Sequence, residues 1–244
     1  MIIKLPFLPW DLNIQRHVRT EDVLTRQTVI KRDGYDKIFC IGQNKTGTTS
    51  LEKLLSLFGF KIGNQSVGEI LSLDWLINKE PQRVIKYCHT ADVFQDVPFS
   101  YPGLYRELDK AFPNSKFILT VRESPDEWFE SLVRFHTKVF SSDASRPPNE
   151  DDLKNATYCY KGYAFEVLAL LYGYPKIALY DESAYKNHYM RDNDEKRTYF
   201  RDRPDNFIEI NLAVKEDFQR LCKFLSVETT IKDFPWLNRS GKSV

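Results

Sequence analysis

The chain has 244 residues, enough to bury the core of a single α/β domain. Its 35 Lys and Arg residues are balanced by 34 Asp and Glu residues, which leaves a formal net charge of +1. This balance excludes a general electrostatic attraction to nucleic acid or to an anionic membrane surface, so any selectivity for anions must be local. The four cysteines are widely spaced, without a C-x-x-C pair, and predict neither a zinc site nor a disulfide framework.

The first ten residues are apolar but are interrupted by Pro6 and Pro9. This stretch is too short for a membrane span or a signal peptide. We therefore predict a soluble, cytoplasmic protein without a membrane span. Residues 1–36 are expected to form an N-terminal extension packed on the core, and residues 37–244 to form the main domain.

The first strong pattern is a strand, a loop and a helix. The apolar residues 38–41 lead into Gly42, and a loop rich in hydroxyl groups follows. Apolar residues at 51, 54, 55 and 58 then put one face of a helix inward, and Gly59 stands where a left-handed cap would end it. Successive backbone N–H groups and the positive end of the helix dipole point at one spot, so this unit predicts an anion site. A tight turn without a ligand is the alternative.

The remaining sequence alternates between predicted strands and helices. Strands are expected at residues 60–63, 93–98, 116–121 and 207–210, and residues 116–121 are apolar enough to be buried on both faces. Helices are expected within 63–83 and at 104–112, from Pro125 onward, at 153–172, 182–201 and 214–225, with a polar loop at 141–152. This alternation predicts a single-domain α/β fold with a central, mostly parallel sheet flanked by helices.

The loop differs from the common nucleoside-triphosphate loop. That motif places Lys-Ser/Thr directly after the second glycine, with the hydroxyl on magnesium. Here Thr48 and Thr49 follow Gly47, and Lys45 lies inside the loop, where a cation can face the outermost group of a bound anion. The strand at 116–121 ends in Thr-Val-Arg and not in the aspartate that a magnesium-dependent enzyme needs. We therefore expect a phosphate-rich ligand that is handled without a metal.

Three charged residues follow predicted strands. Ligands of open parallel sheets bind beyond the carboxyl ends of the strands, and Lys45, Asp96 and Arg122 occupy such positions. Arg122 and Ser131 of the following helix could together hold a second phosphate. The structural alternatives are a surface ion pair of Arg122 with Glu123 or Asp126, an ordinary helix hydroxyl for Ser131, and a loop-capping role for Asp96.

These motifs together resemble those of the PAPS-dependent sulfotransferases, whose donor is 3′-phosphoadenosine 5′-phosphosulfate (PAPS). Residues 44–50, Asn-Lys-Thr-Gly-Thr-Thr-Ser, resemble the 5′-phosphosulfate-binding loop, and residues 116–131, KFILTVRESPDEWFES, resemble the 3′-phosphate-binding strand and helix. Residues 185–188, 199–204 and 207–238 extend the resemblance, so that it covers residues 37–238. It implies a P-loop NTPase-like fold in which residues 37–244 are the sulfotransferase domain.

The resemblance also implies roles for individual residues. It assigns the 5′-phosphosulfate to the loop residues Lys45, Thr46, Gly47, Thr48, Thr49 and Ser50. Arg122 and Ser131 would bind the 3′-phosphate, and Lys45 would also stabilise the charge that builds on the leaving phosphate. Asp96 stands where cytosolic members carry a catalytic histidine, so it would be the general base, with His188 as the alternative base or acceptor ligand.

The sequence departs from the family pattern in three places. Arg122 and Ser131 are nine residues apart, one more than the commonest spacing, and Ser50 replaces an aromatic residue, so adenine stacking must come from elsewhere. The late Arg-Lys-Gly segment has only a candidate remnant at residues 239–242.

The expected reaction moves a sulfuryl group from PAPS to a hydroxyl or amine, releases 3′-phosphoadenosine 5′-phosphate (PAP) and uses no metal. The acceptor would be a small molecule, a glycan or a lipid. Its pocket is expected to be shaped by residues 70–77, 135–152 and 158–174. No nucleic-acid partner is expected, and a homodimer is left open. The alternatives are a nucleotide or small-molecule kinase with a degenerate loop, and a non-catalytic member that binds nucleotide as a scaffold.

Overall fold

The centre of the computed structural model, which describes residues 28–30 and 34–235, is a parallel sheet. Its four strands lie in the order β3-β2-β4-β5, with bounds β2 Ile38–Cys40, β3 Val93–Phe94, β4 Lys116–Thr120 and β5 Phe207–Ile210. A separate antiparallel pair joins β1 (Thr28–Ile30) to β6 (Val227–Thr229). The predicted α/β class with a central parallel sheet is confirmed.

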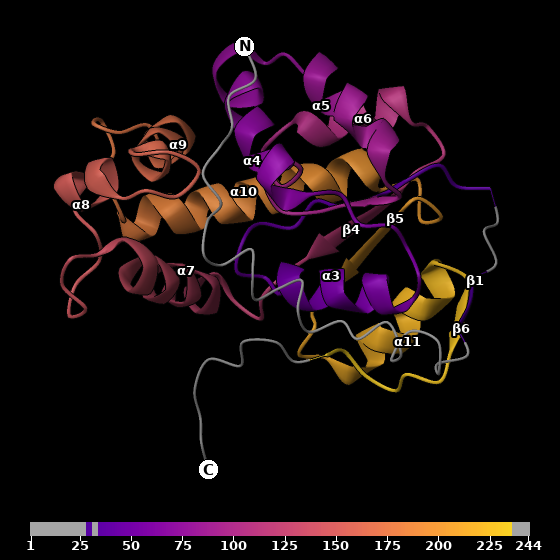
Figure 1. The fold of residues 1–244 in the computed structure, drawn as a ribbon. Helices are drawn as coiled ribbons and strands as arrows, with labels where there is room; N and C mark the ends of the chain where they lie inside the picture. The colour runs from indigo at the N-terminus through magenta and orange to yellow at the C-terminus, as the bar shows by residue number, and fades with distance from the viewer. Residues whose placement is uncertain (1–27, 31–33, 236–244) are drawn as a thin grey trace.

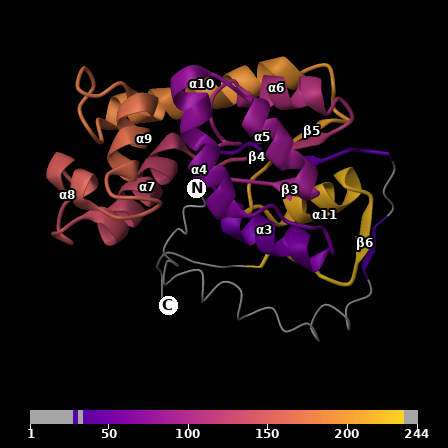
Figure 2. The same ribbon diagram turned by 45° about the horizontal axis from the view of Figure 1, so that its top comes forward.

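Helices cover both faces and one end of this sheet (Figures 1 and 2). Their bounds are α3 Thr48–Leu57, α4 Gln65–Leu73, α5 Gln82–Tyr87, α6 Leu104–Ala111, α7 Pro125–Phe140, α8 Glu150–Asn155, α9 Tyr163–Tyr172, α10 Glu182–Phe200 and α11 Lys215–Phe224. A π-helical turn, η2 (Asp74–Asn78), continues α4, and a 3-10 turn, η3 (Cys88–Thr90), continues α5.

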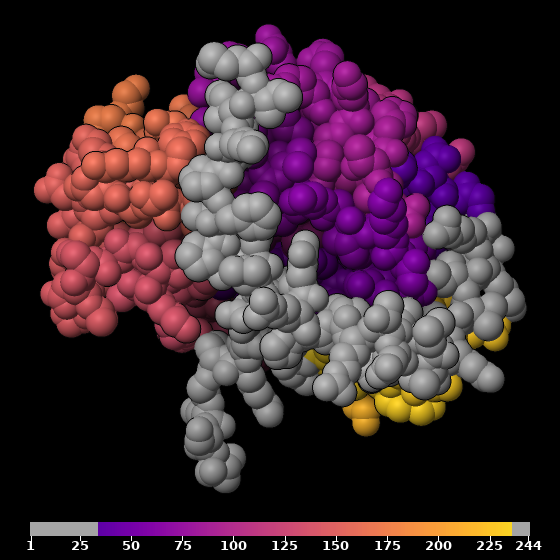
Figure 3. All heavy atoms as spheres, in the orientation of Figure 1, coloured from indigo at the N-terminus to yellow at the C-terminus, as the bar shows by residue number. Residues whose placement is uncertain are grey.

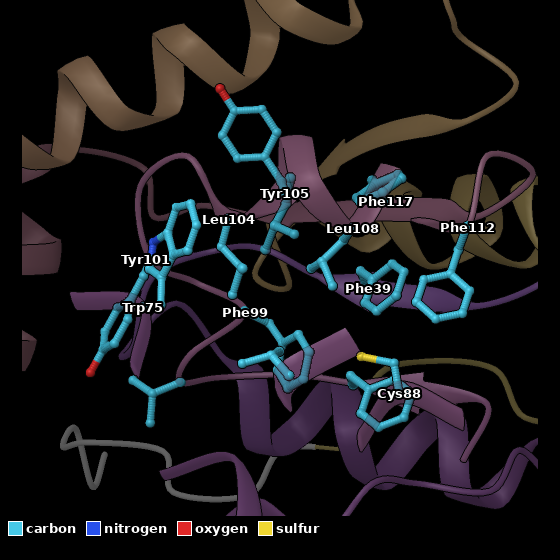
Figure 4. Packing of buried hydrophobic residues seen from close by; sticks show 14 of the residues in the cluster. Phe39, Trp75, Cys88, Phe99, Tyr101, Leu104, Tyr105, Leu108, Phe112 and Phe117 are labelled. Carbon is cyan, nitrogen blue, oxygen red and sulfur yellow. The ribbon is translucent and has the colours of Figure 1, made fainter. Parts of the chain in front are cut away.

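The sheet separates two apolar cores because successive residues of a strand point to opposite faces. Ile38 of β2 and Ile118 of β4 lie in the core that is covered by α3 and α11. Phe39 and Phe117 point into the other core, under α5, α6 and the C-terminal end of α10. Figure 4 shows Phe39 among Phe99, Phe112 and Phe117, with ring centroids 5.4–6.0 Å from its own.

A third core joins α7, α8 and α9 to the N-terminal half of α10. It contains Trp128 and Leu132 of α7, Leu153 of α8, Leu168 of α9 and Tyr185 of α10. These helices form a bulge beside the sheet, visible as the red and salmon part of Figure 3. The packing fixes the face of α7 that is turned toward the β2–α3 loop.

Several predicted elements have different limits in the structure. Residues 60–63 contribute only an isolated parallel bridge, between Ile62 and Val93. The strand expected at 93–98 ends at Phe94, since Asp96 is left-handed (φ 61°) and Pro98 has no N–H to donate.

Two predicted helices are confirmed. The apolar segment within 63–83 forms α4 and η2, and the helix at 104–112 is α6.

The helix expected at 153–172 is two helices. α8 begins at Glu150, inside the predicted polar loop, because Asn149 and Asp152 form a reciprocal capping box. Gly162, with φ 89°, then precedes the separate helix α9. Gly59 has the expected left-handed conformation just after α3 (φ 92°). Most of the predicted N-terminal extension and the segment 239–242 lie outside the described residues.

Candidate functional site

The loop between β2 and α3 is held from one side by side chains that bind its carbonyl oxygens. Trp128 Nε1 of α7 donates to Asn44 O (3.0 Å), and Arg122 Nε donates to Lys45 O (2.7 Å). A trans peptide carries its C=O and N–H on opposite sides, so the N–H groups of residues 45 and 46 face away from Trp128 and Arg122. The loop therefore presents backbone donors on its open side.

Thr46 and Gly47 shape this loop. The Thr46 hydroxyl lies 2.5 Å from Gln43 O and 2.6 Å from Thr120 Oγ1, so its side chain fastens the loop to β4. Any contact of Thr46 with an anion would therefore come from its N–H group. Gly47 has φ 99°, and a Cβ there would lie 2.9 Å from the Leu212 side chain. The position requires glycine for its conformation and for its packing.

The N-terminus of α3 differs from those of α4, α7, α8 and α10. A side chain caps each of those four helices, whereas no side chain of the described residues caps α3. The first N–H groups of a helix lack partners within the helix, and its dipole favours negative charge there. The open end of α3, directly after the loop, is therefore a suitable binding place for an anionic group.

Lys45 and Asp96 lie close enough for their charges to interact, and both have left-handed backbones, at φ 70° and 61°. A non-glycine residue held in this conformation costs about 1–3 kcal/mol, and such residues cluster at functional sites. The structure thus brings together the predicted cation and the predicted base.

The surroundings shift the pKa values of both groups toward neutrality. Burial lowers the pKa of Lys45; the charge of Asp96 opposes this effect, and the charges of Arg122 and Arg134 add to it. Burial raises the pKa of Asp96, against the opposing effects of the Val97 N–H (2.9 Å from Oδ1), the charge of Lys45 and a hydrogen bond with a neighbouring hydroxyl on α3. An ammonium and a carboxylate with converging pKa values are suited to charge stabilisation and proton transfer.

Arg122 joins the same loop from the end of β4. Besides its contact with Lys45 O, its Nη1 pairs with Glu127 Oε1 (2.9 Å), and its N–H donates to the Tyr189 hydroxyl (3.1 Å). The ion pair considered from the sequence, with Glu123 or Asp126, is therefore made with Glu127 instead. Arg122 also borders a cleft of about 260 Å³.

Ser131 lies on the face of α7 that is turned toward the loop. Residues 128, 131 and 135 are spaced i, i+3 and i+7, so Trp128, Ser131 and Phe135 share one face of the helix. Trp128 binds the loop, and the Phe135 ring centroid lies 3.5 Å from Lys45 Nζ. The buried Ser131 side chain stands between these two contacts.

A family model described as a sulfotransferase domain matches residues 37–243. The chain belongs to the sulfotransferase family. No curated protein matches it at a significant level. The matched region begins just before β2 and includes the loop with Lys45, the turn with Asp96 and the end of β4 with Arg122. The resemblance drawn from the sequence motifs is confirmed at the level of the family.

The remaining loop residues of this sulfotransferase lie in the first turn of α3. Thr48 is buried and hydrogen-bonds Asp96, Thr49 is exposed, and Ser50 is buried. Each contributes a backbone N–H to the uncapped helix end, and of the three only Thr49 is exposed.

His188 is placed differently from the other predicted residues. Its ring packs edge-on against Tyr172 of α9 at 5.0 Å, and its charge interactions are with Asp192, Arg191 and Lys196. Within the described chain these neighbours do not include Lys45 or Asp96. Burial lowers the pKa of His188, and its assignment as a base stays a prediction that these contacts do not support.

Two carboxylates whose charges interact with Asp96 were not predicted from the sequence. Glu52 of α3 binds Gln95 Nε2 (2.9 Å), and Glu69 of α4 accepts hydrogen bonds from Tyr158 (3.0 Å) and Cys159 (3.3 Å). Burial and the charge of Asp96 raise the pKa values of both. Glu52 follows Thr48 by one helical turn, a spacing that could have indicated its position. Glu69 had no such signal.

His136 of α7 is a further neighbour of Lys45. Burial, with a smaller effect of the Lys45 charge, lowers the pKa of His136 to about 3, and its Nδ1 lies 3.0 Å from the Tyr180 hydroxyl. The imidazole is therefore neutral at physiological pH.

Other features of the molecule lie away from this site. A hollow of about 580 Å³ on the outer side of α10 is lined by Arg106, Tyr199 and neighbouring residues, none of them a predicted site residue. In the part of the chain that the structure describes, His, Cys, Asp and Glu form no group of three or more that could hold a metal ion. The helices of that part include none that is both long enough and apolar enough to cross a bilayer.

Proposed function

We propose that this sulfotransferase moves the sulfuryl group of PAPS to a hydroxyl or amine of its acceptor and releases PAP. One observation carries the proposal. The carbonyl oxygens of the β2–α3 loop are bound by Trp128 and Arg122, and its N–H groups, Lys45 and the uncapped end of α3 are left for an anion.

The loop fits the phosphosulfate end of this donor. Backbone N–H groups and a helix N-terminus bind phosphate and sulfate oxygens well, and Lys45 adds a cation inside the loop. Arg122 Nε and one N–H of Nη1 bind acceptors on the protein, so Nη2 and the second N–H of Nη1 are the donors proposed for a second phosphate. Arg122 Nε donates to the Lys45 carbonyl, so both cations belong to the same end of the sheet and could bind a ligand with two anionic groups.

Transfer requires a base and a stabilised leaving group. The bond between sulfur and the bridging oxygen of the 5′-phosphate breaks, and a bond forms between sulfur and the acceptor atom. Lys45 stabilises the negative charge that stays on the bridging oxygen, and Asp96 takes the proton of the acceptor. Positioning and charge stabilisation supply most of the catalysis in such transfers, and a general base contributes about 10²–10⁴-fold.

The acceptor would reach Asp96 from the side of α4 and of residues 156–162. Glu69, Tyr158 and Cys159 lie on that side, and the charge of Glu69 interacts with Asp96. These residues belong to the segments that the sequence assigned to an acceptor pocket, or border them.

Labelled PAPS tests the proposal. The protein is incubated with ³⁵S-PAPS and mixtures of phenols, alcohols, amines, glycans and lipids, and labelled products are identified by mass spectrometry. We expect transfer to at least one class by the wild-type protein and none by Lys45→Ala, because the leaving phosphate loses its cation. Binding of ATP–Mg²⁺ without any binding of PAP would overturn the proposal in favour of a kinase.

A further inference from the structure

We propose that Lys196 of α10 is a positioning residue that ties the loop carrying Lys45 to the turn carrying Asp96. This inference rests on the proposed function of these two residues. It concerns a buried side chain outside the set of residues that the sequence assigned to the site.

Lys196 is fully buried and reaches both segments at once. Its Nζ donates to Ile41 O (2.8 Å), where β2 enters the loop, and to Ser100 O (3.2 Å). The N–H of Ser100 in turn donates to Asp96 O (2.9 Å), which closes the turn from 96 to 100. One ammonium group therefore binds two backbone segments, the one that leads to Lys45 and the turn that contains Asp96.

Asp192 adds a second tie to the same loop. Asp192 Oδ2 accepts from Lys196 Nζ (2.6 Å) and from Gln43 Nε2 (3.0 Å), two residues before Lys45. All of these side chains are at least nine-tenths buried. A buried hydrogen-bonded ion pair is rigid, because its separation would leave charges without partners in a low dielectric.

The three contacts require a charged lysine. An ammonium has three donors, which match the two carbonyls and the carboxylate, whereas a neutral amine would have two. Burial lowers the pKa of Lys196, and the charge of Asp192 and its hydrogen bond oppose this effect. Glu195 and His188 of the same helix also have charge interactions with Lys196.

Burying such a network costs free energy, and apolar residues that filled the same space would often make the folded state equally or more stable. What the network adds is a fixed distance between two loops that come from neighbouring strands, β2 and β3. Catalysis depends on that distance, since a misplacement of about 1 Å can cost roughly 10²-fold in rate.

The test is Lys196→Met, which keeps an unbranched, slightly shorter side chain and removes its donors. We expect kcat with the acceptor found by the labelling screen to fall on the order of 10²-fold, in protein that is folded by circular dichroism. The acid limb of the pH profile should also move to higher pH, because Asp96 loses part of the stabilising charge of Lys45. Lys186→Met is the matched control on the same helix, where Lys186 pairs with the surface residues Asp126 and Glu182, and it should match the wild type.

A purely structural lysine gives a different result. In that case Lys196→Met lowers the melting temperature but keeps the wild-type kcat and acid limb, which would overturn the inference.

If Lys196→Met does not fold, Gln43→Met is the second test, since it removes the hydrogen bond to Asp192 and leaves Lys196 in place. We expect about a tenfold loss of kcat from Gln43→Met, and wild-type kinetics would contradict the proposal. A wild-type protein that binds no PAP overturns the proposed function itself, a result distinct from variants that match an active wild type.

Discussion

At the scale of single residues, the site depends on two side chains that the backbone presents in an unusual conformation. Lys45 and Asp96 are both left-handed, and each is buried enough to shift its pKa toward that of the other. Asparagine, like aspartate, can adopt the left-handed conformation, so Asp96→Asn can keep the fold while it removes the basic oxygen. This separates the chemistry of Asp96 from its structural role.

Asp96→Asn should lower kcat by about 10²–10⁴-fold while the affinity for PAP stays near that of the wild type. The affinity is expected to hold because the proposed donor site consists of the loop and Arg122 and does not include the base. Steady-state kinetics and calorimetric titration with PAP measure the two quantities. Wild-type turnover by this variant would remove Asp96 as the base.

The pH dependence of kcat/KM should be a bell narrower than the ordinary pKa values of aspartate and lysine would give. Asp96 must be deprotonated, so activity falls as pH drops through its raised pKa. Lys45 must be protonated, so activity falls as pH rises through its lowered pKa. His136, with a pKa of about 3, stays neutral across the range and cannot supply the acid limb. An acid limb that persists in Asp96→Asn would contradict this assignment.

At the scale of elements, the β2–α3 unit was predictable from the sequence, but the distant side chains that bind its loop were not. The glycines, the hydroxyl-rich loop and the helical spacing are local signals, and they indicated an anion site. Trp128 and Lys196 bind the loop from positions 84 and 155 residues away in the sequence. Such contacts depend on how α7 and α10 pack, which no local pattern reveals. The same reason explains why Glu69 was missed.

Gly47→Ala tests the local requirement of this unit. The substitution adds a Cβ at φ 99° and 2.9 Å from Leu212, so it should reduce the free energy of unfolding by roughly 1–3 kcal/mol. Gly34→Ala is the control, because Gly34 also has a positive φ (74°) but a Cβ there has no neighbour within 4 Å. Chemical denaturation should show the larger loss for Gly47→Ala. Equal losses would mean that the contact with Leu212 is not limiting.

At the scale of the whole molecule, the sequence predicted a central parallel sheet with charged residues at its strand ends, but not the order of its strands. The strand at 116–121 was predicted because a parallel strand that is buried on both faces has a nearly continuous apolar run, and the strand at 207–210 was predicted although Glu209 interrupts its apolar residues. The start of α8 at Glu150 was missed even though Asn149 and Asp152 form a capping box. The break between α8 and α9 was missed because aromatic residues continue through it. The pairing of β1 with β6 joins two strands of three residues, too short to stand out by pattern.

The site as a whole joins four parts of the fold. The loop after β2 supplies Lys45, the turn after β3 supplies Asp96, the end of β4 supplies Arg122, and α7 supplies Ser131. A donor that contacts all of these should depend on both of its anionic groups. The 3′-phosphate is the group that separates PAP from ADP-like nucleotides, so it provides the sharpest comparison.

Calorimetric titration of the protein with PAP and with ADP is the most direct measurement of the central claim. The account predicts that PAP binds more tightly than ADP without added metal, and that Arg122→Ala weakens PAP and removes most of the difference. Charge-assisted hydrogen bonds of about 1.5–3 kcal/mol correspond to a difference of roughly 10–100-fold in affinity. Equal affinities for PAP and ADP, or binding of ATP–Mg²⁺ alone, would contradict the account.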